Sequence, residues 1–107
     1  MLLKKNRVNK KEIDKIFKEG RFVNSSDLTF KYITNSSKLT KISFIAPKNV
    51  AKLAVRRNLL RRKGYRAFKK YLEYFPAGIV GAFVFKKYQD NTLILENEIK
   101  NILSKIN

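Results

Sequence analysis

The sequence predicts one domain of the α/β class, a two-layer α+β sandwich whose elements follow the order α-β-β-α-β-α. Residues 27–34 and 41–46 alternate apolar and polar side chains, as half-buried strands do. Residues 50–75 form a long proline-free segment of helical character, and residues 79–85 are apolar on both faces, which indicates a central strand. A strand, a long helix and an apolar strand make a βαβ unit. Because the 107 residues show no repeat and no linker, we expect a single domain over residues 1–107.

The first element is a short helix over residues 8–20 with signals at both ends. Asn9 is a suitable N-cap, and Glu12, three residues later, can complete a capping box. Gly20 is expected to end the helix in the left-handed conformation. Three residues at helical spacing give this helix one apolar face: Ile13, Ile16 and Phe17.

The two alternating segments are expected to be neighbouring strands. In the first strand the residues at positions 28, 30 and 32 share one face, and Thr29, Lys31 and Ile33 share the other. The second strand ends at Pro47, which has no N–H to donate to a sheet. Turn-forming residues at 35–37 separate the two segments, so we expect an antiparallel hairpin.

Two helices complete the chain. Pro76 and Gly78 are expected to end the long helix. The core face of that helix is expected to contain Leu53, Leu60, Gly64, Ala67, Phe68, Tyr71 and Phe75. Residues 90–92, Asp-Asn-Thr, offer caps for a last helix. The buried stripe of this last helix is expected to contain Leu95, Ile99, Ile102, Leu103 and Ile106.

The composition indicates a polyanion-binding domain. Lysine and arginine number 25 against 8 acidic residues, so the net charge is +17 and the chain repels itself. The aromatic content of 12% is too high for a disordered basic tail. With no Cys and no His, the chain has no disulfide, no Cys-based zinc site and no thiol nucleophile, and it lacks the commonest general base. No segment is long enough for a membrane span or built like a secretion signal, so we expect a soluble cytoplasmic protein.

The positive charge concentrates in the long helix and the loop before it. No acidic residue occurs within residues 28–72, whereas residues 48–70 contain ten lysines and arginines. One side of the helix is expected to present an amide, two guanidinium groups and a phenol, from Asn58, Arg61, Arg62 and Tyr65. Arg57 lies at the border between this side and the core face. Guanidinium groups bind phosphate, Asn can donate to phosphate, sugar or base, and Tyr can stack on an unpaired base.

A nine-residue motif in this helix resembles a known signature. Residues 54–62, AVRRNLLRR, resemble the Arg-Asn-Arg signature A-V-x-R-N-R-x-[KR]-R of the protein subunit of bacterial ribonuclease P. Residues 47–52, PKNVAK, are similar to the family's S-K-K-V-x-K segment ahead of the signature. Arg7-Val8 followed by residues 16–20, IFKEG, is similar to the family's opening R-L…v-F-x-x-G. The resemblance therefore covers nearly the whole chain, in order.

The chain departs from the family pattern at four positions. Leu59 stands where the second Arg of the signature is usual, and the role of that Arg is not transferred to Leu59. Tyr65 stands where a further Arg is frequent, with Arg66 next to it. Pro47 and Asn49 replace the common Ser and Lys of the preceding segment.

The resemblance implies both a fold and a function. The family fold is an α/β sandwich with a left-handed β-α-β crossover, of the ribosomal protein S5 domain 2-like type. The implied partners are the catalytic RNA of ribonuclease P and precursor tRNA, and no membrane or further protein partner is required. In this family the RNA, with Mg²⁺ that it mainly holds itself, hydrolyses the phosphodiester that joins the 5′ leader to the tRNA. The protein binds the RNA and the leader and has no catalytic or metal-binding residue of its own.

The resemblance also implies roles for particular residues. Contacts with the catalytic RNA are expected at Lys48, Lys52, Arg56, Arg57, Asn58, Arg61, Arg62, Tyr65 and Arg66. The cleft for the 5′ leader is expected to involve Ile13, Phe17, Lys31, Tyr32 and Lys86. A slip of one residue in the strand register would exchange Lys31 for Phe30 or Tyr32, so either face of the strand fits the cleft. Arg57→Ala is expected to remove about one phosphate contact from the salt dependence of RNA binding, unless Arg57 has a structural role.

Three other functions fit parts of the sequence. A ribosomal or ribosome-associated protein would share the charge and the α/β class, but not the Arg57-Asn58 motif behind a strand and a Lys-rich loop. A helix-turn-helix DNA-binding regulator needs a second helix after a short turn, whereas Pro47 and Pro76 separate the basic helix from strands. A nuclease acting alone would need metal-binding carboxylates, which residues 28–72 do not supply.

Overall fold

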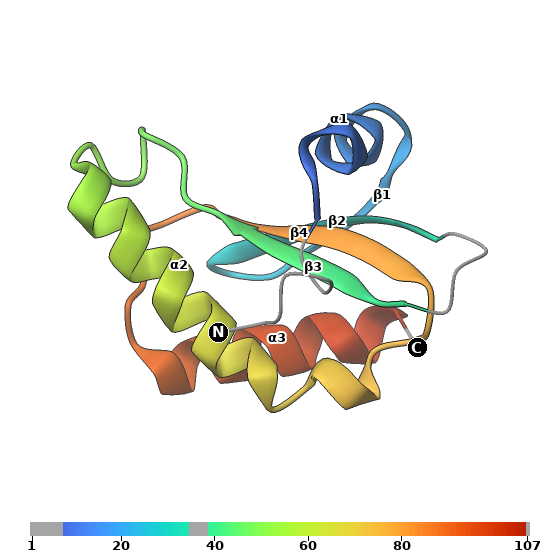
Figure 1. Cartoon of the computed structure of the whole chain (residues 1–107). Helices are drawn as coiled ribbons and strands as arrows, with labels where there is room; N and C mark the ends of the chain where they lie inside the picture. The colour runs from blue at the N-terminus through green and yellow to red at the C-terminus, as the bar shows by residue number, and fades with distance from the viewer. Residues whose placement is uncertain (1–7, 35–38, 107) are drawn as a thin grey trace.

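The structure, a computed structural model, describes residues 8–34 and 39–106. Its elements are α1 (Lys10–Glu19), β1 (Arg21–Asn24), β2 (Leu28–Thr34), β3 (Lys41–Ile45), α2 (Ala54–Lys69), the short 3-10 helix η2 (Leu72–Tyr74), β4 (Ile79–Phe85) and α3 (Thr92–Ile106). Helices α2 and α3 cover one face of a four-stranded sheet, and α1 lies on the other face (Figure 1). The predicted sandwich of helices and sheet is confirmed, with one strand more than expected. None of the described helices is long and apolar enough to cross a membrane.

The strand order corrects the predicted hairpin. The sheet has the order β1-β2-β4-β3, so β4 separates the two strands that the sequence suggested as neighbours. Strand β4 is antiparallel to β2 and parallel to β3. The antiparallel partner of β2 on its other side is β1, a strand that was not expected from the sequence. The turn-forming residues 35–37, on which the hairpin prediction relied, lie outside the described residues.

The predicted βαβ unit is present, and its crossover is left-handed. It consists of β3, α2 and β4, because β3 and β4 run parallel. In Figure 1 both strands run from right to left, β3 lies in front of β4, and α2 returns below the sheet, which is the left-handed sense. A general handedness rule would have given the right-handed form. The family resemblance therefore predicted this feature where the general rule would not.

Helix α2 is shorter than the predicted span of residues 50–75. Before it, the Val50 and Ala51 N–H groups both donate to the Pro47 carbonyl oxygen, at 3.0 and 3.2 Å, so this segment is a tight loop. The helix begins at Ala54, and η2 follows it before the chain turns into β4. Leu53, expected in the core, is the N-cap residue of α2 and is 63% exposed. The loop consequently places Lys48 and Lys52 in solvent ahead of the helix.

Strand β4 lies at the centre of the core, as predicted. Phe83 is fully buried, and its ring stacks on Phe30 from β2 at 4.4 Å and on Phe44 from β3 at 4.8 Å between centroids. Phe68 from α2 and Phe75 pack against the same ring from the helical layer. Burial of this many aromatic rings supplies much of the hydrophobic stabilisation that one small core can provide.

Helix α3 has the cap and buried stripe that the sequence predicted. The Asn91 side-chain oxygen accepts hydrogen bonds from the Leu93 and Ile94 N–H groups at 3.0 and 3.3 Å. Its buried residues include four of the five expected ones, Leu95, Ile99, Ile102 and Leu103. The fifth, Ile106, is partly buried at the end of the helix.

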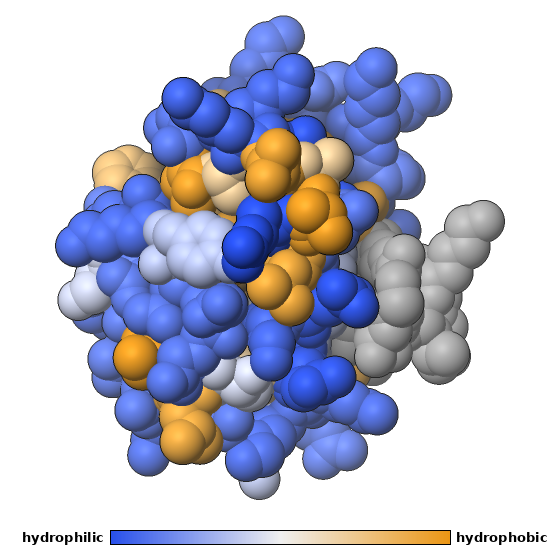
Figure 2. Space-filling model, turned by 90° about the vertical axis from the view of Figure 1, so that its left-hand side faces the viewer, coloured by the Kyte–Doolittle hydropathy of each residue, from blue (hydrophilic) through white to orange (hydrophobic). Residues whose placement is uncertain are grey.

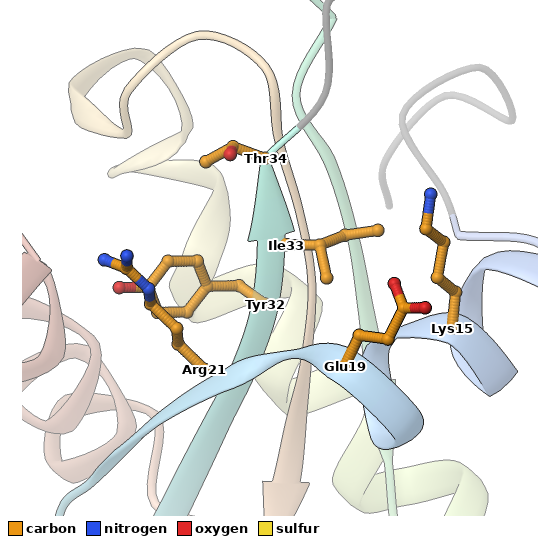
Figure 3. A pocket seen from close by; sticks show the side chains of 6 residues that line it. All are labelled: Lys15, Glu19, Arg21, Tyr32, Ile33 and Thr34. Carbon is orange, nitrogen blue, oxygen red and sulfur yellow. The ribbon is translucent and has the colours of Figure 1, made fainter.

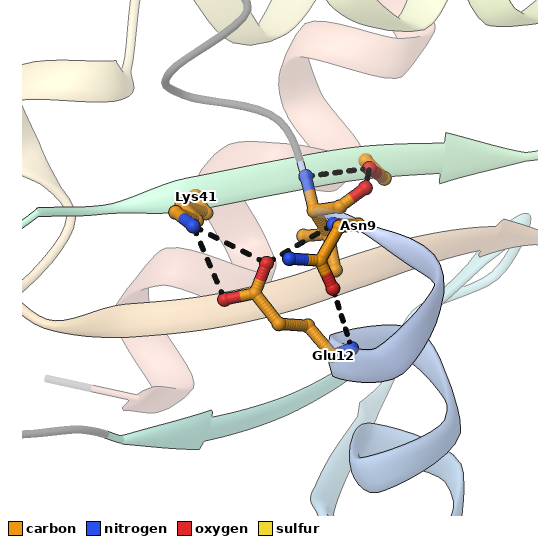
Figure 4. A network of polar contacts seen from close by, with 5 residues as sticks. Asn9, Glu12 and Lys41 are labelled. Atoms are coloured by element: carbon orange, nitrogen blue, oxygen red, sulfur yellow. Dashed lines mark hydrogen bonds and ion pairs between the residues drawn. The ribbon is translucent and has the colours of Figure 1, made fainter.

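Helix α1 has the predicted capping box at its start. The Glu12 N–H donates to the Asn9 side chain at 2.9 Å, and the Asn9 N–H donates to the Glu12 carboxylate at 3.0 Å. The same carboxylate forms an ion pair with Lys41 of β3, and the Val8 N–H donates to the Ser43 hydroxyl at 3.1 Å (Figure 4). These contacts fasten the start of α1 to β3, across the face of the sheet that α2 does not cover.

The expected conformation of Gly20 is wrong. Its φ and ψ of −72° and 154° are extended rather than left-handed. A glycine fits here for a different reason, because a Cβ would collide with the Ile16 carbonyl oxygen and would lie 3.0 Å from the Tyr32 carbonyl oxygen. Close packing of the end of α1 against β2 therefore explains this residue.

Asn9→Ala is expected to lower the free energy of unfolding by about 1 kcal/mol, because it removes the side-chain acceptor of the capping box. Urea titration followed by circular dichroism measures the change. The control is Asn97→Ala at an exposed position within α3, where alanine has the higher helix propensity and no loss is expected. Equal destabilisation by the two variants would contradict a capping role for Asn9.

Candidate nucleic-acid interface

Helix α2 turns one face to the core and the other to solvent. Its buried residues are Leu60, Gly64, Ala67 and Phe68. Gly64 lets the helix approach β3 closely, because a Cβ there would overlap the ring of Phe44. The polar side chains of the predicted motif lie on the remaining surface and are exposed at Arg56, Asn58, Arg61, Arg62 and Arg66. Lys48 and Lys52 are exposed in the preceding loop, so most of the predicted RNA-binding residues are exposed on α2 and on the loop that leads into it.

Arg57 differs from the other arginines of the motif. It is half-buried, and its Nη1 atom donates to the Ala51 and Lys52 carbonyl oxygens at 3.0 and 2.7 Å. Hydrogen bonds from a charged donor are stronger than neutral ones. The Arg57 guanidinium therefore holds the loop that carries Lys48 and Lys52 against the first turn of α2.

Two side chains on the exposed face of α2 are fixed by contacts within the protein. The Arg61 guanidinium donates to the side-chain oxygen of Asn58. The Tyr65 hydroxyl accepts a hydrogen bond from the Phe44 N–H at 3.3 Å, and the two rings meet edge to face with 5.1 Å between centroids. Tyr65 also lines a hollow of about 320 Å³ together with Arg62, Arg66 and Lys69.

The charge on this surface is largely unbalanced. Lys70 forms an ion pair with Glu96 of α3 at 2.8 Å, and the hydrogen bond and charge of Glu96 raise the pKa of Lys70 above its ordinary value. Across residues 8–34 and 39–106, none of the other lysines and arginines of positions 48–70 has a carboxylate within ion-pair distance. Lys70 thus belongs to the contact between α2 and α3, and the others present net positive charge to solvent.

The end of the molecule where α2 begins also exposes apolar side chains. Leu53 and Val55 are more than half exposed there, and Leu93 and Ile94 are exposed at the start of α3. Figure 2 shows this end, where groups of apolar atoms lie among predominantly hydrophilic ones. The basic surface is therefore bordered by exposed apolar side chains.

A second candidate surface lies on the opposite face of the sheet, beside α1. Phe17 is 45% exposed, and the Lys31 ammonium lies 4.8 Å from the centroid of its ring. Phe22, 64% exposed, is the register partner of Lys31 on β1 and so shares its face of the sheet. Ile13, which belongs to α1 like Phe17, is half-buried. This surface combines aromatic rings with a cation, as surfaces that bind single-stranded nucleic acid do.

The structure separates two of the predicted leader-cleft residues from this surface. Tyr32 lies on the other face of β2, where its ring stacks on Phe30 at 5.3 Å between centroids. Lys86 follows the end of β4, and its ammonium donates to the Ser25 carbonyl oxygen at 3.0 Å. Of the two faces that the sequence allowed, the one with Lys31 faces α1, and Tyr32 lies on the opposite face of β2.

A hollow of about 370 Å³ lies at the end of β2, next to α1 (Figure 3). It is lined by Lys15, Glu19, Arg21, Tyr32, Ile33 and Thr34. In Figure 3, Arg21 and Tyr32 lie on one side of β2, whereas Lys15, Glu19 and Ile33 lie on the other. The hollow thus lies at the end of the strand where the two faces of the sheet meet.

Three residues of these candidate surfaces were not predicted from the sequence: Phe22, Lys15 and Arg21. Phe22 belongs to β1, which has four residues and no buried position, so it shows no alternation of buried residues. The available signal was a Phe-Val pair followed by Ser25, Ser26 and Asp27, a strand-favouring pair before turn-forming residues. Lys15 and Arg21 carried no signal beyond their charge.

The chain resembles known proteins in both sequence and structure. The family model described as Ribonuclease P matches residues 2–107. The Ribonuclease P protein component of Borrelia duttonii (strain Ly) is 32% identical over 107 residues, which cover 97% of this chain and 92% of the relative. The solved structure of the RNase P protein from Thermotoga maritima has a TM-score of 0.83 at 18% identity, covering 94% of this chain and 97% of that chain. The Staphylococcus aureus RNase P protein has a TM-score of 0.80 at 18% identity, with 94% of each chain covered. At this identity the structural likeness shows a shared fold.

Proposed function

This chain belongs to the ribonuclease P protein component family, and we propose that it binds the catalytic RNA of ribonuclease P and the 5′ leader of precursor tRNA. The observation that carries the proposal is the match of residues 2–107 with the family. The exposed basic surface around α2 supplies its physical basis. In this role the protein assists removal of the leader during maturation of the 5′ end of tRNA.

The surface around α2 is proposed to bind the catalytic RNA. The exposed side chains of Arg61, Arg62 and Arg66 have guanidinium groups that match phosphate oxygens. Lys48 and Lys52 extend this surface beyond the helix, in the position that Arg57 maintains through its hydrogen bonds to the loop. Each phosphate that these groups neutralise releases counterions, which favours binding at low salt.

The surface beside α1 is proposed to bind the leader. Phe17 and Phe22 offer exposed rings for unpaired bases, and Lys31 lies close enough to Phe17 to pair with an adjacent phosphate. Because the two surfaces lie on opposite faces of the sheet, the protein can contact the catalytic RNA and the leader at the same time.

We assign the Mg²⁺ of the proposed reaction mainly to the RNA. All eight acidic residues lie within the described residues, and no three of them gather into a group that could hold a metal ion. Mg²⁺ requires near-octahedral oxygen coordination. In this proposal the phosphates of the RNA hold most of the ligand positions of the ion, and the protein contributes binding, orientation of the leader and neutralisation of phosphate charge.

Adding the protein to a bacterial ribonuclease P RNA and precursor tRNA at low Mg²⁺ is expected to raise the rate of leader removal well above that of the RNA alone. The net charge of +17 replaces part of the cation screening that the RNA otherwise needs. A gel assay of the released leader measures the rate. If the protein neither accelerates cleavage nor prefers this RNA to ribosomal RNA, the proposal is wrong.

A matched pair of variants tests whether α2 is responsible. The double variant Arg61→Ala/Arg62→Ala removes two exposed charges from α2 and is expected to lose most of the acceleration. Lys100→Ala removes an exposed charge from α3 and is expected to retain the acceleration. An equal loss per charge removed in the two variants would point to net charge alone rather than to the surface around α2.

A further inference from the structure

We propose that the hollow beside Tyr65 is a stacking site for one unpaired base of the partner RNA, an inference that rests on the proposed function and makes it more specific. The hollow has a volume of about 320 Å³ and is lined by Arg62, Tyr65, Arg66 and Lys69. All four residues belong to α2 and lie within two turns of that helix. The hollow therefore combines one aromatic ring with three cationic side chains.

The Tyr65 ring is held in place by the protein itself. Its hydroxyl accepts the Phe44 N–H at 3.3 Å, and its ring meets the Phe44 ring edge to face at 5.1 Å between centroids. Phe44 is itself buried and stacks on Phe83, so the contact continues into the rigid core. A ring already held in one orientation loses little rotamer freedom when a base stacks on it.

The cations around the ring suit the phosphates that flank a stacked base. Arg62, Arg66 and Lys69 are exposed, and none of them has a carboxylate within ion-pair distance among the described residues. Along α2 each of these three residues lies about one helical turn after the one before it, a rise of roughly 5.4 Å. A nucleotide that places its base on Tyr65 therefore has cationic groups available for the phosphates on both of its sides.

An unpaired base explains the hollow better than a phosphate alone. A site for phosphate alone needs cations, which Arg62, Arg66 and Lys69 already supply, whereas the Tyr65 ring adds a flat apolar surface that a phosphate does not use. The family that the sequence resembles frequently has Arg at this position. In this chain Tyr65 has an aromatic ring in place of that charge. Stacking on an aromatic ring tolerates any base and contributes substantially to the binding of single-stranded RNA.

A tryptophan at position 65 provides a direct test, because the chain contains no other tryptophan. Tyr65→Trp is titrated with a short oligoadenylate and with an oligomer of equal length that has abasic sites throughout. The oligoadenylate is expected to quench the tryptophan emission, whereas the abasic oligomer is expected to bind through its phosphates without quenching. Tyr74→Trp, at an exposed position on η2, serves as the control that neither oligomer quenches.

Two further variants measure how much the ring contributes. Tyr65→Leu is expected to weaken oligoadenylate binding by about tenfold, which corresponds to the loss of one stacked base. Tyr65→Phe keeps the ring and loses only the hydroxyl, so it is expected to bind nearly as well as the natural protein. Circular dichroism on each variant verifies that it is folded, and the comparison of the two oligomers on Tyr65→Trp still tests the stacking site if Tyr65→Leu unfolds.

The outcomes separate this inference from the proposed function. Equal quenching by the two oligomers, or unchanged affinity of folded Tyr65→Leu, overturns the stacking site while binding to the ribonuclease P RNA persists. Failure of the unsubstituted protein to bind that RNA overturns the proposed function instead. Selective quenching by the oligoadenylate together with weaker binding by Tyr65→Leu establishes the stacking site.

Discussion

Phe83→Ala is expected to lower the free energy of unfolding by about 3–5 kcal/mol. Phe83 is fully buried at the centre of the sheet, and its ring contacts Phe30 and Phe44 from the neighbouring strands and Phe68 and Phe75 from the helical layer. Alanine would leave a cavity walled by four aromatic rings, which cannot collapse without moving both layers. Domains of this size have a total stability of about 5–15 kcal/mol, so the variant is expected to be marginally folded.

Urea titration at low temperature measures the change, with Phe22→Ala as the matched control. Phe22 is the same residue type in the same sheet, but it lies on β1 and is 64% exposed, so its removal is expected to cost less than about 1 kcal/mol. A loss of similar size in the two variants would show that the core is not centred on Phe83.

Arg57→Ala is expected to reduce the affinity for the catalytic RNA by about tenfold or more while leaving the salt dependence of binding unchanged. The guanidinium of Arg57 donates to two carbonyl oxygens in the loop that carries Lys48 and Lys52. Without these hydrogen bonds the loop must become ordered when the RNA binds, and that cost applies equally at every salt concentration. The number of phosphates neutralised stays the same, so the slope against salt is retained.

Filter binding over a range of salt concentrations distinguishes this role from a direct contact. Arg61→Ala removes an exposed guanidinium from the same helix, so its slope is expected to fall by about one phosphate contact, roughly 0.7–0.9 in a double-logarithmic plot. Both hydrogen bonds come from one guanidinium nitrogen, so Arg57→Lys, which keeps the charge and several N–H donors, is expected to retain more of the affinity than Arg57→Ala. A lower slope for Arg57→Ala would show instead that Arg57 contacts a phosphate.

The elements of this fold could be predicted from the sequence because each has a local signature. The capping box at Asn9 and Glu12, the cap at Asn91 and the apolar run of β4 depend on residues only a few positions apart. The pairing of strands could not be predicted in the same way. Alternation shows which residues share a face of a strand, but it carries no information on which strand lies beside it. The insertion of β4 between β2 and β3 depends on contacts across half the chain.

The candidate site shows the same difference between features set by local spacing and features set by contacts between distant elements. The exposed charges of α2 follow from helical spacing, so Arg61 and Arg62 lie where the sequence predicted them. Arg57 was correctly placed at the border of the core face, but its partners belong to a loop whose path the sequence does not specify. The face of β2 that lies beside α1 is fixed by the packing of Lys31 on Phe17, a contact between different elements.

The central position of β4 has a consequence for how the protein is made. A chain leaves the ribosome from its N-terminus, so β2 and β3 are synthesised well before the strand that joins them. Until residues 79–85 emerge, the strands have unpaired edges, which in other proteins are templates for aggregation. The emerging chain already contains the ten lysines and arginines of residues 48–70, and their mutual repulsion opposes contact between unfinished copies. The positive charge of residues 48–70, which we propose to bind RNA, is thus also expected to limit self-association of the nascent protein.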